Sequence, residues 1–233
     1  FLRRAYVDIA GRIPTIEEAE NFHGSTYERK RSQLISDLLE GDGSVSHGYN
    51  FWADVLRINN ALGGASGQAE AAYQLWLKKA LDENKPYDQF VQELVSATGK
   101  VWDNGAIGYY IRDRGMPLDN MSNTVRVFLG TRLECAQCHD HPFDKWTQMD
   151  FYHMAAFSYG VNVQNRQGGT MFQEIQREMN SNKKMDRDDK RNLQRALQEI
   201  RRPIRNTPVV EFQPEKMPQL PHDYQYDDAK PKE

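Results

Sequence analysis

Residues 135–139 read Cys135-Ala136-Gln137-Cys138-His139, and we expect the fold of the chain to be organised around them. They follow the C-x-x-C-H pattern of c-type haem attachment sites. This order suits the chemistry, because two thiols add across the two vinyl groups of one porphyrin and the adjacent imidazole reaches the iron. The chain has two cysteines in all, both in this motif. The sequence therefore predicts one haem c, bound covalently through Cys135 and Cys138, with His139 as an axial ligand.

Three other interpretations of the two cysteines stay open: a redox disulfide, half of a zinc site, or a chance pair. A thioredoxin-like C-x-x-C would lie in a βαβ pattern, which the surrounding sequence lacks. A structural zinc ion needs more sulfur and imidazole ligands than two cysteines supply. Haem is therefore the favoured prediction.

The segments on both sides of the motif are expected to be helical. Asp119 is a candidate N-cap, and an apolar stripe at helical spacing follows it. This pattern would place the motif at the C-terminal end of a helix, with positions 135, 138 and 139 on one face. After Pro142, Thr147 and Asp150 form a capping box for a helix that can fold back over the motif. The stripe comprises Val125, Phe128, Leu129 and Leu133.

Glycines interrupt the helical pattern between residues 99 and 118, so this segment is predicted to be a loop. In such a loop Tyr109 could stack on a haem edge, and Arg112 and Arg114 could pair with the propionates. The alternative is a surface loop with solvated arginines. Tyr109, Arg112 and Arg114 are candidate haem-binding residues.

The motif does not define the second axial ligand of the iron. A low-spin electron carrier needs a Met or His ligand there, whereas a peroxidase-type site keeps the position open. His141 lies too close to His139 along the chain to reach the opposite face of the porphyrin. The preferred candidate metal ligand besides His139 is His153. The other candidates are Met116, Met121, Met149 and Met154.

Helical signals dominate the first hundred residues. A periodic apolar pattern predicts a helix over residues 2–10, closed by Gly11. Capping boxes at residues 15–18 and 25–28 each predict the start of another helix. Three more helices are expected from about Tyr49 to the glycines at 63, 64 and 67, around residues 73–81, and between Pro86 and Gly99. Trp52 and Trp76 are interpreted as core residues of these helices.

The C-terminal third differs in composition. Residues 164–206 are polar, with apolar positions spaced for two amphipathic helices, which predicts a helical hairpin. Residues 207–233 are rich in proline and predict an extended linker, with one short strand at 209–210. We thus expect a mainly α protein: a compact helical bundle around the haem over residues 1–163, followed by this polar arm and a linker toward a further domain.

Composition and motifs argue against several classes of function. The chain has 233 residues and a formal net charge of −3, so no global positive field would attract nucleic acid. No apolar run approaches the ~20 residues that cross a bilayer. Paired-carboxylate, Ser-His-Asp, phosphate-loop and zinc-hydrolase patterns are not found. Because the chain starts inside an amphipathic pattern and ends in a linker, we expect it to be part of a longer protein.

Several stretches together resemble a known family. They are Arg126-Val-Phe-Leu-Gly130, Cys135-Ala-Gln-Cys-His-Asp-His-Pro-Phe-Asp144, Trp146-Thr-Gln148 and Ala155-Ala-Phe157. They are similar to a cytochrome-c-like domain family of unknown function, found in large secreted proteins of planctomycete and verrucomicrobial bacteria. The opening residues 3–18 and the closing residues 223–231 match the usual limits of that domain, so the resemblance covers nearly the whole chain.

The resemblance implies a haem-c domain that is exported to the periplasm or beyond. It implies Cys135, Cys138 and His139 as the haem residues, and a C-terminal domain of the same parent protein as a partner. His141 belongs to the family pattern, which implies a structural or metal-related role for it. The family supplies no activity.

Three classes of function remain. The preferred one is electron transfer to or from a partner domain or a soluble redox carrier. The second is a haem enzyme, for instance peroxidase-like, with an open face on the iron. The third is a non-redox binding module in which the haem, or a disulfide between Cys135 and Cys138, is structural. The sequence leaves open whether the protein is an enzyme.

Overall fold

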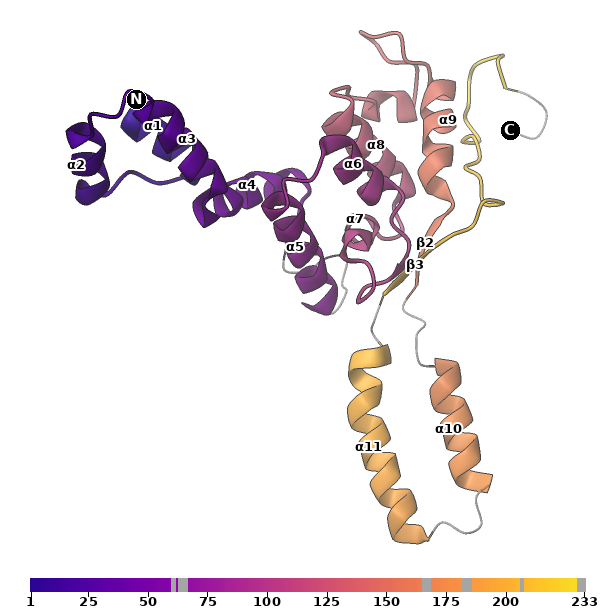
Figure 1. Ribbon diagram of the computed structural model, residues 1–233. Helices are drawn as coiled ribbons and strands as arrows, with labels where there is room; N and C mark the ends of the chain where they lie inside the picture. Colours follow the sequence, from indigo (N-terminus) through magenta and orange to yellow (C-terminus); the bar gives the residue numbers. More distant parts are fainter. Residues whose placement is uncertain (60–61, 63–66, 165–168, 182–185, 206–207, 230–233) are drawn as a thin grey trace.

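Helices make up most of the molecule, so the predicted mainly α class is confirmed (Figure 1). The structure is a computed structural model that describes residues 1–59, 62, 67–164, 169–181, 186–205 and 208–229. Within these residues, no helix combines the length and the apolar character needed to cross a membrane.

The chain begins with α1 (Leu2–Ala10), α2 (Ile16–Gly24) and α3 (Lys30–Glu40). Helix α1 ends where predicted, because Gly11 adopts a left-handed conformation with φ of 67°. The capping box of α2 is present: the Thr15 side chain accepts from the backbone N–H of Glu18, and the Glu18 carboxylate accepts from the N–H of Thr15. These local signals therefore define the first two helices.

The second predicted capping box, at residues 25–28, is wrong. Ser25 is the C-cap of α2, and its Oγ accepts a hydrogen bond from the backbone N–H of Tyr27. Helix α3 starts only at Lys30, without a side-chain cap. The Ser25 hydroxyl closes a local turn instead, an alternative that serine side chains commonly offer to the backbone.

Helix α4 (Asp42–Val55) starts seven residues before the predicted Tyr49. Its first turn follows Gly41 directly, so α3 and α4 are almost continuous along the chain. Gly67 begins the next helix instead of ending this one, whereas Gly63 and Gly64 lie outside the described residues. The helix therefore lies earlier in the sequence than its aromatic residues indicated.

The first core forms around α5 (Gly67–Asp82) and α6 (Tyr87–Val95). Trp52 and Trp76 pack at its edge as predicted, with ring centroids 5.0 and 5.1 Å from that of Phe90. Such aromatic contacts bury large apolar areas where helices cross. The fully buried large side chains of this core include Leu56, Tyr73, Leu77, Leu94, Ile107, Tyr109 and Ile111.

The predicted loop between residues 99 and 118 is wrong for most of its length. It contains strand β1 (Gly99–Lys100), the 3-10 helix η2 (Gly105–Ile107) and helix α7 (Gly108–Ile111), and the next helix α8 (Pro117–Phe128) already starts at Pro117. Two glycines here permit close packing: a Cβ on Gly105 would lie 2.3 Å from the carbonyl oxygen of Ala72, and one on Gly108 would lie 2.3 Å from the Tyr73 ring. These glycines therefore let η2 and α7 approach α5.

A small antiparallel sheet closes this part of the fold. Strand β3 (Val209–Phe212) lies between β1 and β2 (Val161–Gln164), with Val210 opposite both Gly99 and Val163. The strand predicted at 209–210 is confirmed and extends to Phe212. Because Val209 and Val210 are buried, this C-terminal strand belongs to the same packed structure as the helices.

A second core forms where α8 crosses α9 (Gln148–Tyr159). Leu220 packs against it, so the extended C-terminal segment returns along the protein after β3 (Figure 1). The predicted polar hairpin is present as α10 (Gly169–Ser181) and α11 (Arg187–Arg205), which lie side by side and extend away from the sheet. The buried members of this core are Met121, Val125, Leu133, Ala136, Phe151, Tyr152 and Ala155.

The contact between α7 and α5 predicts a strong steric effect of Gly108→Ala. The backbone of Gly108 is ordinary for any residue, with φ of −51°, so the added methyl group acts only through its overlap with the buried Tyr73 ring. Overpacking of this kind costs about 1–3 kcal/mol, which should lower the urea midpoint measured by circular dichroism. Gly24→Ala is the matched control, because no atom lies within 4 Å of the new Cβ there. Equal stability of both variants would contradict this packing.

Candidate functional site

The C-x-x-C-H motif lies on a 3-10 turn, η3 (Glu134–Gln137), and not at the end of a helix as predicted. Helix α8 stops at Phe128, and Gly130 then adopts a left-handed conformation with φ of 65° that leads the chain away from the helix axis. Leu133 is fully buried in the second core and anchors the chain just before the turn. The motif is thus separated from α8 by an irregular segment of five residues, 129–133.

The turn presents both cysteines to the outside. A 3-10 turn stacks positions i and i+3, and the backbone N–H of Cys138 lies 3.4 Å from the carbonyl oxygen of Cys135. Both cysteines are exposed free thiols. Ala136 between them is fully buried against α9. The predicted helical placement of positions 135, 138 and 139 is wrong, because Cys135 lies in the 3-10 turn and Cys138 is its C-cap.

His139 follows directly, and its side chain is exposed. Its Nδ1 lies 2.7 Å from the backbone carbonyl oxygen of Asp140. A carbonyl oxygen only accepts hydrogen bonds, so Nδ1 is the protonated ring nitrogen. Nε2 then keeps its lone pair for a metal or a proton, the arrangement that a metal-ligating histidine commonly has.

Asp140 is held by two other parts of the chain. Its Oδ1 accepts a hydrogen bond of 2.8 Å from the backbone N–H of Gln148, in the first turn of α9. Its own N–H donates to the hydroxyl of Tyr226, at 2.8 Å. The buried Gln148 side chain donates to the carbonyl of Gln137, at 3.0 Å. The start of α9 and the C-terminal segment therefore fix the backbone on which His139 sits.

His141 closes the loop beyond the motif. Its backbone N–H donates to the Trp146 carbonyl at 2.8 Å, and its Nδ1 accepts from the N–H of Phe143 at 3.2 Å. These bonds give His141 a local structural role in the loop.

The Phe143 ring itself is 94% exposed, which leaves a large apolar side chain uncovered in the loop beside the motif.

Tyr152 is a titratable residue of the second core that interacts electrostatically with Cys138. Burial raises the pKa of its phenol, and the nearby Cys138 and Asp223 raise it further. The ring packs in the second core at an edge-to-face angle of 78° to Phe151. Tyr152 therefore stays a neutral hydroxyl at ordinary pH, close to one of the two sulfurs.

Tyr109 and Arg112 lie in the first core instead of an exposed loop. Tyr109 is 1% exposed, and the Arg112 guanidinium is paired with the buried carboxylate of Asp113 at 2.6 Å. Both predicted haem-binding residues thus have partners of their own inside the protein. Arg114 is partly buried and lines a cavity between α8, α9 and β2.

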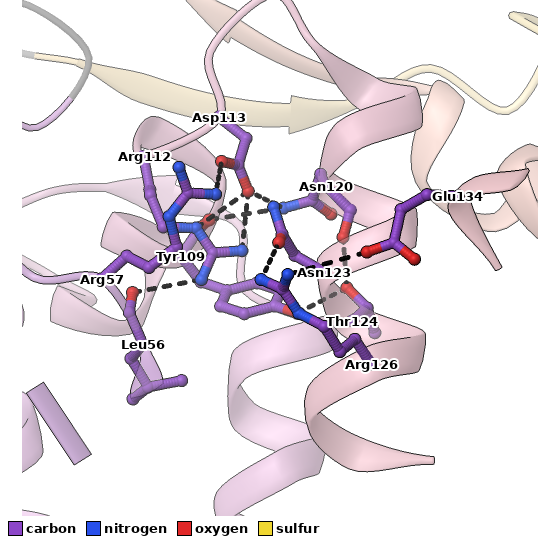
Figure 2. A network of polar contacts seen from close by, with 10 residues as sticks. All are labelled: Leu56, Arg57, Tyr109, Arg112, Asp113, Asn120, Asn123, Thr124, Arg126 and Glu134. Atoms are coloured by element: carbon purple, nitrogen blue, oxygen red, sulfur yellow. Dashed lines mark hydrogen bonds and ion pairs between the residues drawn. The ribbon is translucent and has the colours of Figure 1, made fainter. Parts of the chain in front are cut away.

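A polar network nevertheless connects this first core with the motif (Figure 2). Asn120 on α8 donates to the Asp113 carboxylate at 3.1 Å. Further along the same helix, Arg126 donates to Asn123 at 2.7 Å and lies 3.6 Å from the carboxylate of Glu134. Glu134 directly precedes Cys135, so α8 carries polar contacts from the buried ion pair to the start of the turn.

The candidate distal ligands fall into two groups. Met121 and Met149 are buried, at 5% and 7% exposure, and Met121 fills the second core. His153 and Met116 are exposed, and Met154 packs partly against the second core. Across the described residues, no three His, Cys, Asp or Glu side chains gather as a metal-binding group.

Sequence patterns did not identify the residues that support the motif. Gln148 is the first residue of a helix that was predicted, but its side-chain bond to Gln137 has no local signature. Tyr226 lies 86 positions after its partner Asp140, in a segment predicted as a linker. The aromatic and amide side chains there gave no signal that the segment folds back to the motif.

Comparison with known proteins identifies a family. Residues 1–162 match PSCyt2, described as a protein of unknown function (DUF1549), and the chain belongs to this family. No curated protein and no solved structure matches the chain. The matched part contains the motif and all helices up to α9, whereas β3 and Tyr226 lie beyond it.

The bond between Asp140 and Tyr226 predicts a local effect of Tyr226→Phe. The change leaves the Asp140 N–H without its acceptor, and such a bond contributes about 1 kcal/mol. The Asp140 amide should therefore exchange with solvent roughly fivefold faster, as measured by hydrogen exchange. Tyr27→Phe, in the exposed segment before α3, is the control and should leave this exchange rate unchanged. Unchanged exchange in Tyr226→Phe would show that the C-terminal segment does not hold the motif.

Proposed function

We propose that this member of the PSCyt2 family carries one haem c, bound through thioethers to Cys135 and Cys138, with His139 as the proximal ligand. The observation that carries the proposal is the geometry of η3. The turn buries Ala136 and leaves two free thiols exposed, and the imidazole that follows them is also exposed.

The donor set fits this cofactor. Thioether formation needs two accessible free thiols, and an axial imidazole needs an available nitrogen, which Nε2 of His139 supplies while Nδ1 faces Asp140. The bound group would provide one-electron redox chemistry. Asp140 would orient the ligand, and Gln148 and Tyr226 would hold Asp140 in place.

Electron transfer is the role that we propose for the site. Cys135, Cys138 and His139 are all exposed, so a group attached there would be accessible to a partner domain or a soluble redox carrier. The bare Phe143 ring in the adjoining loop offers apolar surface for the porphyrin or for that partner. The C-terminal domain of the parent protein is the proposed partner within the same chain. Because c-type haem is attached outside the inner membrane, the proposed location is periplasmic or otherwise extracytoplasmic.

We further propose that the protein supplies the distal ligand, with His153 as the first candidate. Met121 and Met149 are used as core residues, which leaves His153, Met116 and Met154 as the accessible donors. His153 is an exposed imidazole on α9, the helix that packs directly against η3. A protein ligand on both faces favours electron transfer, whereas an open face would favour a peroxidase-like enzyme.

Covalent attachment is tested by producing the chain with an export signal in a host that has the c-haem maturation machinery. The wild type should keep its haem through acid–acetone extraction, because thioethers survive treatment that removes a coordinated haem. Cys135→Ala combined with Cys138→Ala should lose all covalent haem. His141→Ala is the matched control and should keep it, since that imidazole serves the loop.

The competing uses of the two cysteines give different products in the same experiment. A wild-type protein that folds and is exported but contains a Cys135–Cys138 disulfide, or a zinc ion, would refute the haem proposal. Free-thiol titration and metal analysis of the purified protein distinguish these outcomes. A disulfide would support the binding module without redox function.

The distal ligand is tested by the ferric absorption spectrum with and without cyanide. The wild type should be low-spin and bind cyanide slowly, and His153→Ala should become high-spin and bind it at once. Met116→Ala and Met154→Ala are tested in parallel, and Met149→Ala, a buried core position, is the control for nonspecific loosening. A high-spin wild type that binds cyanide immediately would favour the haem enzyme.

A further inference from the structure

A cavity of about 300 Å³ lies between three segments that are far apart in the sequence. One wall comes from the end of α7 and the start of α8, a second from the end of α9 and β2, and the third from Lys216 in the C-terminal segment. This volume lies at the lower end of the range for small-molecule sites. The cavity is separate from the C-x-x-C-H motif, none of whose residues lines it.

The charges that line the cavity are unbalanced. Asp113 is the one carboxylate among the lining residues, and it is already compensated by Arg112 at 2.6 Å and by Arg57 at 3.6 Å. Arg114 and Lys216 also line the cavity, and within the described part of the chain neither side chain has a hydrogen bond or an ion pair. The cavity therefore has two cations without a counter-charge.

The remaining lining favours a polar ligand. Asn162 contributes an amide, and Tyr110 and Tyr159 contribute aromatic rings. Ser158 and Asn120 also line the cavity, but their donors are already used within the protein. Gly115 and Pro117 border the cavity at the N-terminal end of α8, where the helix dipole adds partial positive charge. Two free cations, neutral hydrogen-bonding groups and a helix N-terminus are the elements that proteins use to bind oxyanions.

We propose that this cavity binds a small molecule that carries a carboxylate, phosphate or sulfate group. Arg114 offers a planar guanidinium that can bind two oxygens at once, and the exposed Lys216 adds an ammonium group. Asn120 forms a fixed part of the wall, because its amide already donates to Asp113 and to the carbonyl of Tyr109, so the contacts to the anion come from Arg114, Lys216 and Asn162. The ligand would link the C-terminal segment to α8 and α9, which carry the first and second walls.

The test is calorimetric titration of the full chain with inorganic phosphate, sulfate and succinate at low ionic strength, where screening is weak. At least one of these should bind saturably at a ratio of one to one, and the strongest identifies the anionic group that the site prefers. Arg114→Gln and Lys216→Gln should each weaken that binding about tenfold or more. Arg3→Gln, an exposed cation on α1, is the matched control and should bind as the wild type does.

A second measurement locates the binding. Trypsin cleaves after Lys216, so the bound anion should slow this cleavage in the wild type and leave cleavage in the α10–α11 arm unchanged. Absence of saturable binding for all three anions would overturn the proposal. Equal binding by the wild type and an Arg114→Gln/Lys216→Gln double variant that keeps the wild-type melting temperature would also overturn it. Both outcomes are independent of whether a haem is attached at the motif.

Discussion

The buried ion pair between Arg112 and Asp113 connects the parts of the fold that carry the motif. The guanidinium lies 2.6 Å from the carboxylate, donates to the carbonyl of Leu56 at 3.1 Å and stacks 4.5 Å from the centroid of the Tyr109 ring. Asn120 binds the same carboxylate from α8. Removal of Asp113 would leave the buried charge of Arg112 uncompensated, which costs about 3–5 kcal/mol in such pairs. The end of α4, helix α7 and the start of α8 are thus held at one point.

This arrangement explains how a short turn can be presented at the surface. Helix α8 starts at the ion pair and packs against α9 in the second core, and the η3 turn inserts Ala136 and Leu133 into the same core. Cys135 and Cys138, which lie on either side of the buried Ala136 along the chain, are exposed. Gln148 at the start of α9 and Tyr226 in the C-terminal segment fix the backbone around His139. Rigid support of this kind orients a metal-binding side chain before any ligand is present.

Sequence patterns predicted those parts of the fold that depend on local chemistry. The glycine that ends α1, the capping box of α2 and the capping box of α9 all behave as their sequences indicate. The loop predicted for residues 99–118 is wrong because glycine can either break a helix or permit close packing. Gly105 and Gly108 do the second, and the difference depends on Ala72 and Tyr73, which approach only in the folded protein.

In the candidate site too, local motifs are predictable from the sequence, whereas contacts between distant segments are not. The five residues of the motif are recognisable because the chemistry requires them to be adjacent. The prediction that Arg112 binds a haem propionate fails because Asp113, its neighbour, is buried with it and neutralises its charge. The sequence does not show this burial. The contribution of Tyr226 could not be predicted, because it arises from a segment that folds back over 86 positions to reach Asp140.

The most direct test of the account is the intact mass of the exported wild-type chain, purified after production with the c-haem maturation machinery and denatured before measurement. If the haem is bound as proposed, the mass equals that of the polypeptide plus one haem, and fragmentation locates the addition between Cys135 and Cys138. A mass equal to the polypeptide alone, or to the polypeptide less two hydrogens for a disulfide, would contradict the proposal.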